Sequence, residues 1–288
     1  MHLDALAAVG APVCPRELAR TYNRGAYDDP WEVVIDYSRA LEAVAEDPDR
    51  GPTSIAREID IPRSRLRPWL DGSLPDPVRA IEVVDALGWM LRDDEAIGGD
   101  VGRALNVLVT WIYSGGSIKT DTYTPFFTVD DFTDADLLER SGQVLGVEMD
   151  FTRKASSQRA TELRPIRNAS LLGRVLYVLG APVGEKNEAA EIELPGYLRT
   201  APEVVLREFV QVYLQNRGQR YQDKRTVTMQ ESRSVEYLQS LAALIQRVTG
   251  ENVSVSGKDV IVSADAARQI ETWPEPFGDV TLAPDQAV

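Results

Sequence analysis

The chain has 288 residues, of which 43% are hydrophobic, and its 45 acidic and 31 basic side chains give a formal charge of −14. This length is sufficient for two globular domains. A single cysteine, Cys14, excludes an internal disulfide, and a single histidine, His2, excludes a histidine-rich metal site and argues against a histidine-based catalytic triad. We expect no cofactor.

The chain contains no apolar run near the ~20 residues that a membrane helix needs. Its first residues lack the basic region and long apolar core of a signal peptide. The sequence therefore predicts a cytoplasmic protein with no membrane partner.

The negative charge argues against a nucleic-acid partner. However, arginine outnumbers lysine by 26 to 5, and the acids are spread over many segments. That pattern is typical of halophilic proteins, in which surface acidity reflects the solvent and does not report the partner. An acidic protein that never contacts DNA is the alternative interpretation.

Residues 1–92 predict an all-α N-terminal domain. The stretch 4–9 is short and apolar, 31–45 has apolar residues near helical spacing, and 47–52 is a turn by composition. Residues 53–70 are typical of a helix-turn-helix, in which Ile55, Ala56, Ile59, Leu66 and Trp69 would face the core.

Within this motif Thr53 or Ser54 is predicted to cap the first helix. The turn would lie near Asp60, and Pro62 suits the first turn of the second helix. Asp60 occupies a position where glycine is commonest, and Pro68 is expected to end or kink the second helix.

The second helix leaves a basic set of side chains pointing outward, as a major-groove reader requires. These candidate DNA-binding residues are Arg63, Ser64, Arg65 and Arg67. The alternative is a small helical bundle with solvated arginines. After it, 78–91 is expected to form a closing helix and 93–100 a linker.

Two later segments have the same pattern, an apolar helix end followed by glycine and a strand. The first is Leu108–Ile118 and the second is Val210–Arg220, and their glycines, Gly116 and Gly218, are 218 − 116 = 102 residues apart. Two copies at this distance predict a pair of pseudo-symmetric halves.

These segments resemble degenerate copies of the helix-and-turn motif of the LAGLIDADG homing endonucleases. The text between them, Leu-Gly-Ala-Pro-Val-Gly-Glu-Lys at 179–186, is similar to the phrase that separates the two repeats in that family. The resemblance implies an α+β fold: after the all-α helix-turn-helix module, a two-repeat αββαββα pseudo-dimer with β-saddles. Its domain would span 101–270, with repeats at about 104–200 and 201–270 and a loose tail at 271–288.

The family holds its divalent metal with the last acid of each motif, and the resemblance puts Gly115 and Arg217 at these degenerate catalytic positions. Glycine supplies no ligand and arginine repels a cation, so we expect neither a bound metal nor a catalytic residue. Asp121, Asp223 and Glu208 lie near the motifs and are interpreted as surface acids. An active endonuclease is the alternative.

The predicted strand pair at 147–167 and the corresponding part of the second repeat at 217–233 are rich in basic side chains, and in the family such strands lie along the DNA major groove. A solvated strand face is the alternative. The candidate DNA-binding residues here are Lys119, Arg153, Lys154, Arg159, Arg164, Arg167, Arg220, Lys224, Arg225 and Arg233.

Together these features predict a sequence-specific binder of double-stranded DNA, a transcription regulator that does not cut its site. WhiA-like regulators combine similar parts in the opposite order. The alternatives are an RNA-binding, maturase-like protein and a protein-interaction scaffold. One chain holds both halves, so a monomer suffices for the saddle, and a dimer could form through the N-terminal domain.

Overall fold

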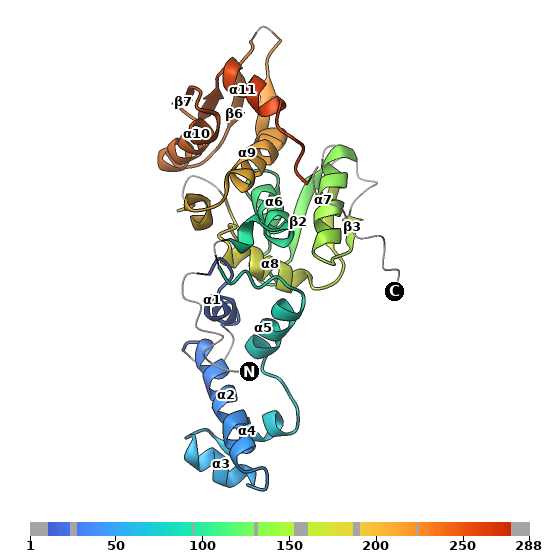
Figure 1. Ribbon diagram of the computed structural model, residues 1–288, viewed down its shortest axis with the longest axis vertical. Coiled ribbons are helices and arrows are strands. Elements are labelled where there is room, and N and C mark those ends of the chain that lie inside the picture. Colours follow the sequence, from blue (N-terminus) through green and yellow to red (C-terminus); the bar gives the residue numbers. More distant parts are fainter. Residues whose placement is uncertain are drawn as a thin grey trace. The chain divides into compact units, whose positions relative to one another are not determined.

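A computed structural model gives the structure of the chain (Figure 1). It describes residues 11–23, 28–93, 95–129, 132–152, 161–186, 191–222 and 224–277. The chain forms two compact units, residues 1–93 and 94–288. None of the helices within the described ranges combines the length and the apolar character needed to cross a membrane.

The described part of the first unit is helical. Leu18, Val34, Leu66 and Val78 come from four different helices and are fully buried in its core. The helices are α1 (Pro15–Arg20), α2 (Trp31–Glu46), α3 (Pro52–Glu58), α4 (Arg63–Leu70) and α5 (Asp76–Ala86).

The predicted starts of α3 and α4 are wrong by one to three residues. Gly51 precedes α3 and Pro52 is its first residue, so neither Thr53 nor Ser54 caps it. Proline is favoured there because the first N–H groups of a helix have no partner inside the helix. Pro62 is the residue before α4 and does not lie within its first turn.

Asp60, between the two helices, adopts a left-handed conformation with φ of 55°. This explains how an acid replaces the common glycine, because aspartate enters this region more readily than most residues. Pro68 lies inside α4, and the helix ends two residues later at Leu70. Proline has no N–H to donate within a helix, and the early end of α4 agrees with the prediction that Pro68 would end or kink it.

The predicted helix 78–91 is too long, because α5 ends at Ala86. Gly88 follows with φ of 71°, a left-handed conformation that terminates helices. Trp89 is fully buried although it lies outside the helix.

The second unit runs twice through the order helix, two strands, helix, two strands, helix. The first series is α6 (Asp100–Ser114), β1 (Gly116–Ile118), β2 (Pro125–Val129), α7 (Phe132–Val144), β3 (Met149–Thr152), β4 (Thr161–Pro165) and α8 (Ala169–Val178). The second is α9 (Glu203–Arg217), β5 (Gly218–Arg220), β6 (Val227–Gln230), α10 (Val235–Thr249), β7 (Val253–Ser256), β8 (Asp259–Val262) and α11 (Ala264–Glu271). Short 3₁₀ helices, η2 (Ala96–Gly98) and η3 (Gly196–Arg199), precede α6 and α9.

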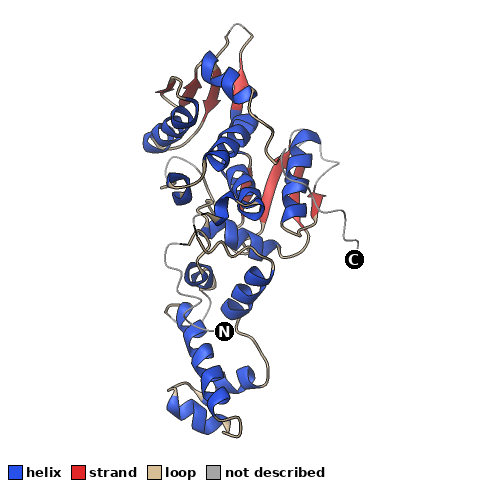
Figure 2. Ribbon diagram, viewed as in Figure 1, coloured by secondary structure: helices blue, strands red, loops and turns tan. Residues whose placement is uncertain are grey.

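Each series forms one antiparallel four-stranded sheet, with the orders β1-β2-β4-β3 and β5-β6-β8-β7. The registers also correspond, since Gly116 pairs with Phe127 and Gly218 pairs with Met229. Helices pack against each sheet (Figure 2). The predicted α+β class is confirmed.

α6 and α9 pack against each other at the centre of this unit (Figure 1). Every residue of α6 from Gly102 to Ser114 is buried. The Asn106 amide donates to the Val205 carbonyl at 3.1 Å, and the Tyr197 hydroxyl donates to Asn106 Oδ1 at 2.8 Å. Because these buried polar groups are paired, they fix the contact between the helices.

The stretch directly after α11 is not the loose tail that the sequence predicted. Phe277 is buried, its ring lies 5.6 Å from the Arg103 guanidinium, and its N–H donates to Glu208 Oε1. Arg103 donates to the same oxygen from Nε at 3.0 Å and from Nη2 at 2.6 Å. This buried ion pair joins α6 to α9 and anchors the chain after α11, and it leaves no role for Glu208 as a surface acid.

The two motif glycines lie where the chain turns from helix to strand without space for a side chain. A Cβ on Gly116 would approach the Phe126 carbonyl oxygen to 2.6 Å, and one on Gly218 would approach the Leu214 oxygen to 2.5 Å. Backbone atoms cannot move aside as flexible side chains do, so both positions require glycine.

We therefore expect Gly116→Ala to lower the free energy of unfolding by about 1–3 kcal/mol, the usual cost of overpacking. Gly196→Ala is the control, because a Cβ at Gly196 meets no atom within 4 Å. Urea unfolding followed by circular dichroism measures both, and equal stability of the two variants would contradict the steric argument.

Candidate nucleic-acid interface and polar centre

α4 presents the side chains predicted to contact DNA. Arg63, Ser64 and Arg67 are exposed, and Arg65 is half-buried. On the opposite side of the helix Leu66 and Trp69 are buried, as predicted. The Trp69 ring packs edge-on against Tyr37 of α2, with 5.8 Å between ring centroids, which fixes the orientation of α4.

In each sheet, side chains alternate between the face that packs on helices and a second face, here called the outer face. Along β2, for example, Pro125, Phe127 and Val129 are buried, whereas Phe126 and Thr128 are half-buried. Strand pairing extends this alternation across the first sheet. Its outer face carries Ser117, Phe126, Thr128, Asp150, Thr152, Glu162 and Arg164.

The outer face of the second sheet is formed mainly by amide and hydroxyl side chains. Such groups both donate and accept hydrogen bonds, which is the property that reading base edges requires. This face carries Gln219, Thr228, Gln230, Ser254, Ser256, Asp259 and Ile261.

The predicted cations of the strand pairs fall into three groups. Lys119, Arg164, Arg167, Lys224 and Arg225 are exposed, on the outer face or in turns beside the strands. The Lys119 ammonium lies 5.1 Å from the centroid of the Phe126 ring. Arg153, Lys154 and Arg159 lie outside the described residues.

Arg220 and Arg233 form the third group, and neither lies on an outer face. Arg220 pairs in register with the buried Val227, so it points to the helix side, where it forms an ion pair with Glu271 of α11. Arg233 is buried, and its Nη2 donates to the Tyr113 carbonyl. The prediction that Arg233 contacts DNA is wrong, and Arg220 is directed away from the predicted surface.

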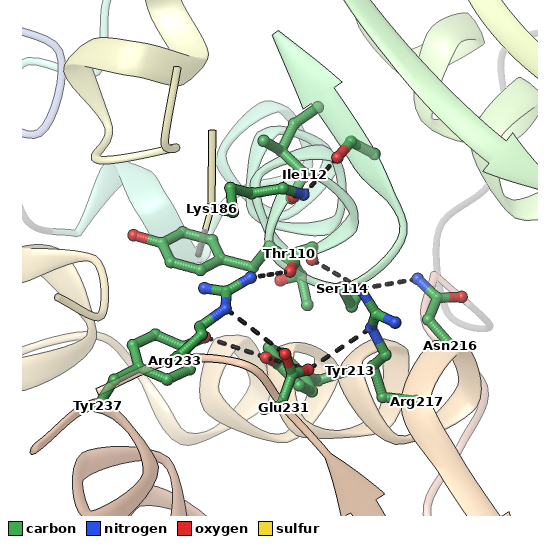
Figure 3. Close-up of polar contacts among 12 residues, drawn as sticks. Thr110, Ile112, Ser114, Lys186, Tyr213, Asn216, Arg217, Glu231, Arg233 and Tyr237 are labelled. Atoms are coloured by element: carbon green, nitrogen blue, oxygen red, sulfur yellow. Dashed lines mark hydrogen bonds and ion pairs between the residues drawn. The ribbon is translucent and has the colours of Figure 1, made fainter. Parts of the chain in front are cut away.

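Arg233 belongs instead to a cluster at the C-terminal ends of α6 and α9, which we call the polar centre (Figure 3). Its residues come from both helices, from the segment after α8, from the segment between β6 and α10, and from the first turn of α10. They are Ser114, Lys186, Tyr213, Asn216, Arg217, Glu231, Arg233 and Tyr237.

Glu231 is the carboxylate of the polar centre and is only 4% exposed. The Tyr213 hydroxyl donates to its Oε1 at 2.8 Å, and Arg217 Nε lies 3.5 Å from the same oxygen. Arg233 Nε lies 3.5 Å from Oε2. Two guanidinium groups thus surround one carboxylate, which holds it in place and neutralises it.

Lys186 lies at the end of α6, where its ammonium donates to the carbonyls of Ile112 and Gly116. Ile112 lies in the last turn of α6, where carbonyls lack partners within the helix and a cation is favoured, and Gly116 begins β1. Between the helix ends, Asn216 Nδ2 donates to Ser114 Oγ at 2.7 Å, and this hydroxyl donates to the Thr110 carbonyl at 2.8 Å.

A pocket of about 340 Å³ opens at this point. Lys186 and Arg217 line it together with the Ser114 and Asn216 side chains and the Gly115–Gly116 backbone, and none of the side chains that line it is acidic. The polar centre as a whole contains three cations, Lys186, Arg217 and Arg233, and one carboxylate, Glu231. It is a local positive site in a chain of charge −14.

The pKa of Lys186 reflects this environment. Burial, which is the largest cause, and the positive charges of Arg233 and Arg217 together lower it from the usual value of 10.5 to about 8, although Glu231 acts in the opposite direction. Two cations beside the buried Lys186 ammonium make its loss of a proton easier.

The structure places Gly115 and Arg217 at the ends of the paired helices, where the resemblance would require acids. Of the other acids considered, Glu208 is paired with Arg103, Asp121 is exposed, and Asp223 lies outside the described residues. Among the described residues, no group of three or more histidine, cysteine or acidic side chains could hold a metal ion.

Sequence reasoning missed the tyrosines and Glu231 as members of one cluster. Tyr213 and Arg217 are four residues apart on α9 and therefore share a helix face, so the sequence alone could have placed these two side chains together. Nothing in the sequence places Glu231 or Tyr237 beside them, because these residues come from a later strand end and helix.

A comparison of the chain with models of known protein families gives no match. A comparison with curated proteins gives none either.

The lowered pKa of Lys186 predicts a pH effect on stability. Between about pH 8 and 10.5 the unfolded chain holds a proton on this lysine that the folded chain has lost, so this group stabilises the fold increasingly as pH rises. We expect the unfolding free energy of the wild type, relative to that of Lys186→Met, to increase from pH 7.5 to 10. A pH-independent difference would contradict the assigned environment.

Proposed function

We propose that the chain is a transcription regulator that binds a specific sequence of double-stranded DNA without cutting it. Its first unit would bind through a helix-turn-helix formed by α3 and α4. Its second unit would be a two-repeat, LAGLIDADG-like pseudo-dimer that presents both outer faces to DNA. The observation that carries this proposal is the polar centre, which offers cations and no accessible carboxylate.

The polar centre supports binding over cleavage. Metal-assisted hydrolysis of a phosphodiester needs carboxylates that hold a divalent cation. Here Arg217 occupies one motif position, Gly115 offers no ligand, and Glu231 is neutralised by two arginines. Lys186 and Arg217 instead suit a backbone phosphate, which they would attract as part of the sequence-independent affinity.

The outer faces support sequence recognition. Gln219, Thr228 and Gln230 lie on one face and Ser117 and Thr128 on the other. Amide and hydroxyl groups can bond base edges in the major groove, whereas exposed cations beside the strands would contact phosphates. This division of roles explains how an acidic chain can bind DNA.

α4 supports a second contact region. Arg63 and Arg67 point outward from a helix that is anchored by Leu66 and Trp69. A short, well-anchored helix with outward arginines is the arrangement that a groove reader requires. One chain contains both sheets, so a monomer would be enough for the second unit.

The α4 contacts predict a change in the salt dependence of binding. Each phosphate contact adds about one to the slope of log affinity against log salt concentration. We expect Arg63→Ala and Arg67→Ala each to reduce this slope by about one on a random-sequence duplex pool, measured by fluorescence anisotropy. Arg39→Ala, at an exposed position of α2, is the control and should leave the slope unchanged.

The polar centre predicts that a negative charge introduced at Gly115 weakens DNA binding. A Cβ there would lie 3.4 Å from Trp111 Nε1 and 3.5 Å from the Asn216 amide, both ordinary contacts, so a side chain fits. We expect Gly115→Asp to lower DNA affinity at least tenfold relative to Gly115→Asn, which has the same size and no charge. Equal affinities would show that no phosphate lies at the polar centre.

A further inference from the structure

A second concave site lies in the same unit, away from the outer faces. It is a cleft of about 690 Å³ between residues 191–199 and the helix α10. Its apolar lining includes Leu194, Leu198, Leu244 and the ring of Tyr237. This volume lies within the range of sites that enclose small organic molecules.

The two ends of the cleft carry opposite charges. Glu236 lies in the first turn of α10 and Arg247 in the last, which the helical rise separates by about 16 Å. Arg247 Nη1 is 3.3 Å from the Leu198 carbonyl oxygen and 3.4 Å from that of Arg199, so Arg199 lies at the same end.

The other end of the cleft is acidic. The Tyr113 hydroxyl donates to the Glu193 carbonyl at 2.6 Å, and the Tyr113 ring stacks on Tyr237, the neighbour of Glu236 in sequence. Glu191, two residues before Glu193, also lines the cleft. Three glutamates, Glu191, Glu193 and Glu236, therefore line the cleft, with Glu193 and Glu236 near the tyrosine pair, and two arginines line the other end.

We propose that this cleft binds a short, apolar peptide with free ends, its amino terminus among the glutamates and its carboxylate at Arg199 and Arg247. An extended chain spans about 3.3 Å per residue, so about five residues cover the distance between the charged ends. The ammonium group matches the carboxylates, the terminal carboxylate matches the arginine forks, and apolar side chains contact the leucines.

The cleft is connected to the polar centre through tyrosines. Tyr237 forms part of the cleft wall, and its hydroxyl lies 3.1 Å from that of Tyr213, which donates to Glu231. Arg233 lies over the Tyr237 ring, 4.5 Å from its centroid. If the proposed function holds, a bound peptide acts as an effector, because it contacts a residue that positions the cations of the polar centre.

Peptide binding is tested without DNA. The probe is a pool of five-residue peptides with free ends and randomised apolar central positions, and the full chain is used to capture them for mass spectrometry. We expect enrichment of members of this pool and at least tenfold weaker capture of the same sequences when either the amino end is acetylated or the carboxyl end is amidated. The proposal would be overturned if no peptide is enriched, or if acetylation and amidation of the peptide ends leave the capture unchanged.

Arg247→Glu tests the orientation of the peptide. This variant should bind the best peptide at least tenfold more weakly and should no longer prefer the free carboxylate over the amide. The control is Gln246→Glu, which adds a charge on the same helix at a residue that does not line the cleft. An unchanged preference for the free carboxylate in Arg247→Glu would contradict the assigned orientation.

The effector role is tested separately with the best peptide at saturation. We expect DNA affinity to change several-fold in the wild type and to stay constant in Tyr237→Phe, which lacks the hydroxyl that meets Tyr213. An equal change of DNA affinity in both proteins would contradict the proposal that the Tyr237 hydroxyl connects the cleft to the polar centre. Because capture is measured without DNA, failure of the DNA-binding proposal and failure of the peptide proposal remain distinguishable.

Discussion

The contact between α6 and α9 determines the geometry of the second unit. Its buried polar groups, the Arg103–Glu208 pair and the Asn106 hydrogen bonds, define how the two helices are placed along each other. Each helix passes directly into the first strand of a sheet through a glycine that cannot carry a side chain. The helix contact therefore positions both sheets, and it brings the two helix ends together at the polar centre.

The charges at those helix ends explain why we favour binding without cleavage. Two helix C-termini attract cations through their unpaired carbonyls. In this chain the cations are protein side chains: Lys186 donates to the Ile112 carbonyl in the last turn of α6, and Arg217 is the last residue of α9. A fixed ammonium and a fixed guanidinium at these places repel a metal ion and leave a net positive site, which is why we propose that a phosphate binds there.

The sequence predicted the α+β class and the positions of most helices and strands, because periodicity and the glycine-marked turns are local signals. Local signals also led to the errors. Arg220 was predicted on the DNA-facing side of the strands, but strand register directs it to the helix side, where it pairs with Glu271. Arg233 was predicted to be exposed, but it is buried beside Tyr113. Phe277 lies in a proline-rich end without periodicity, yet it packs on Arg103 from a helix far earlier in the chain. Contacts between distant segments of this kind leave no pattern in a single sequence.

The central claim is that this chain binds a defined duplex sequence and leaves it intact. The most direct measurement is selection of bound molecules from a pool of random duplex DNA at high salt with magnesium present, with product lengths checked on a gel. The account predicts an enriched sequence recovered only as full-length duplex. Recovery of fragments cut within the enriched sequence, or no enrichment beside strong capture of structured RNA, would contradict it.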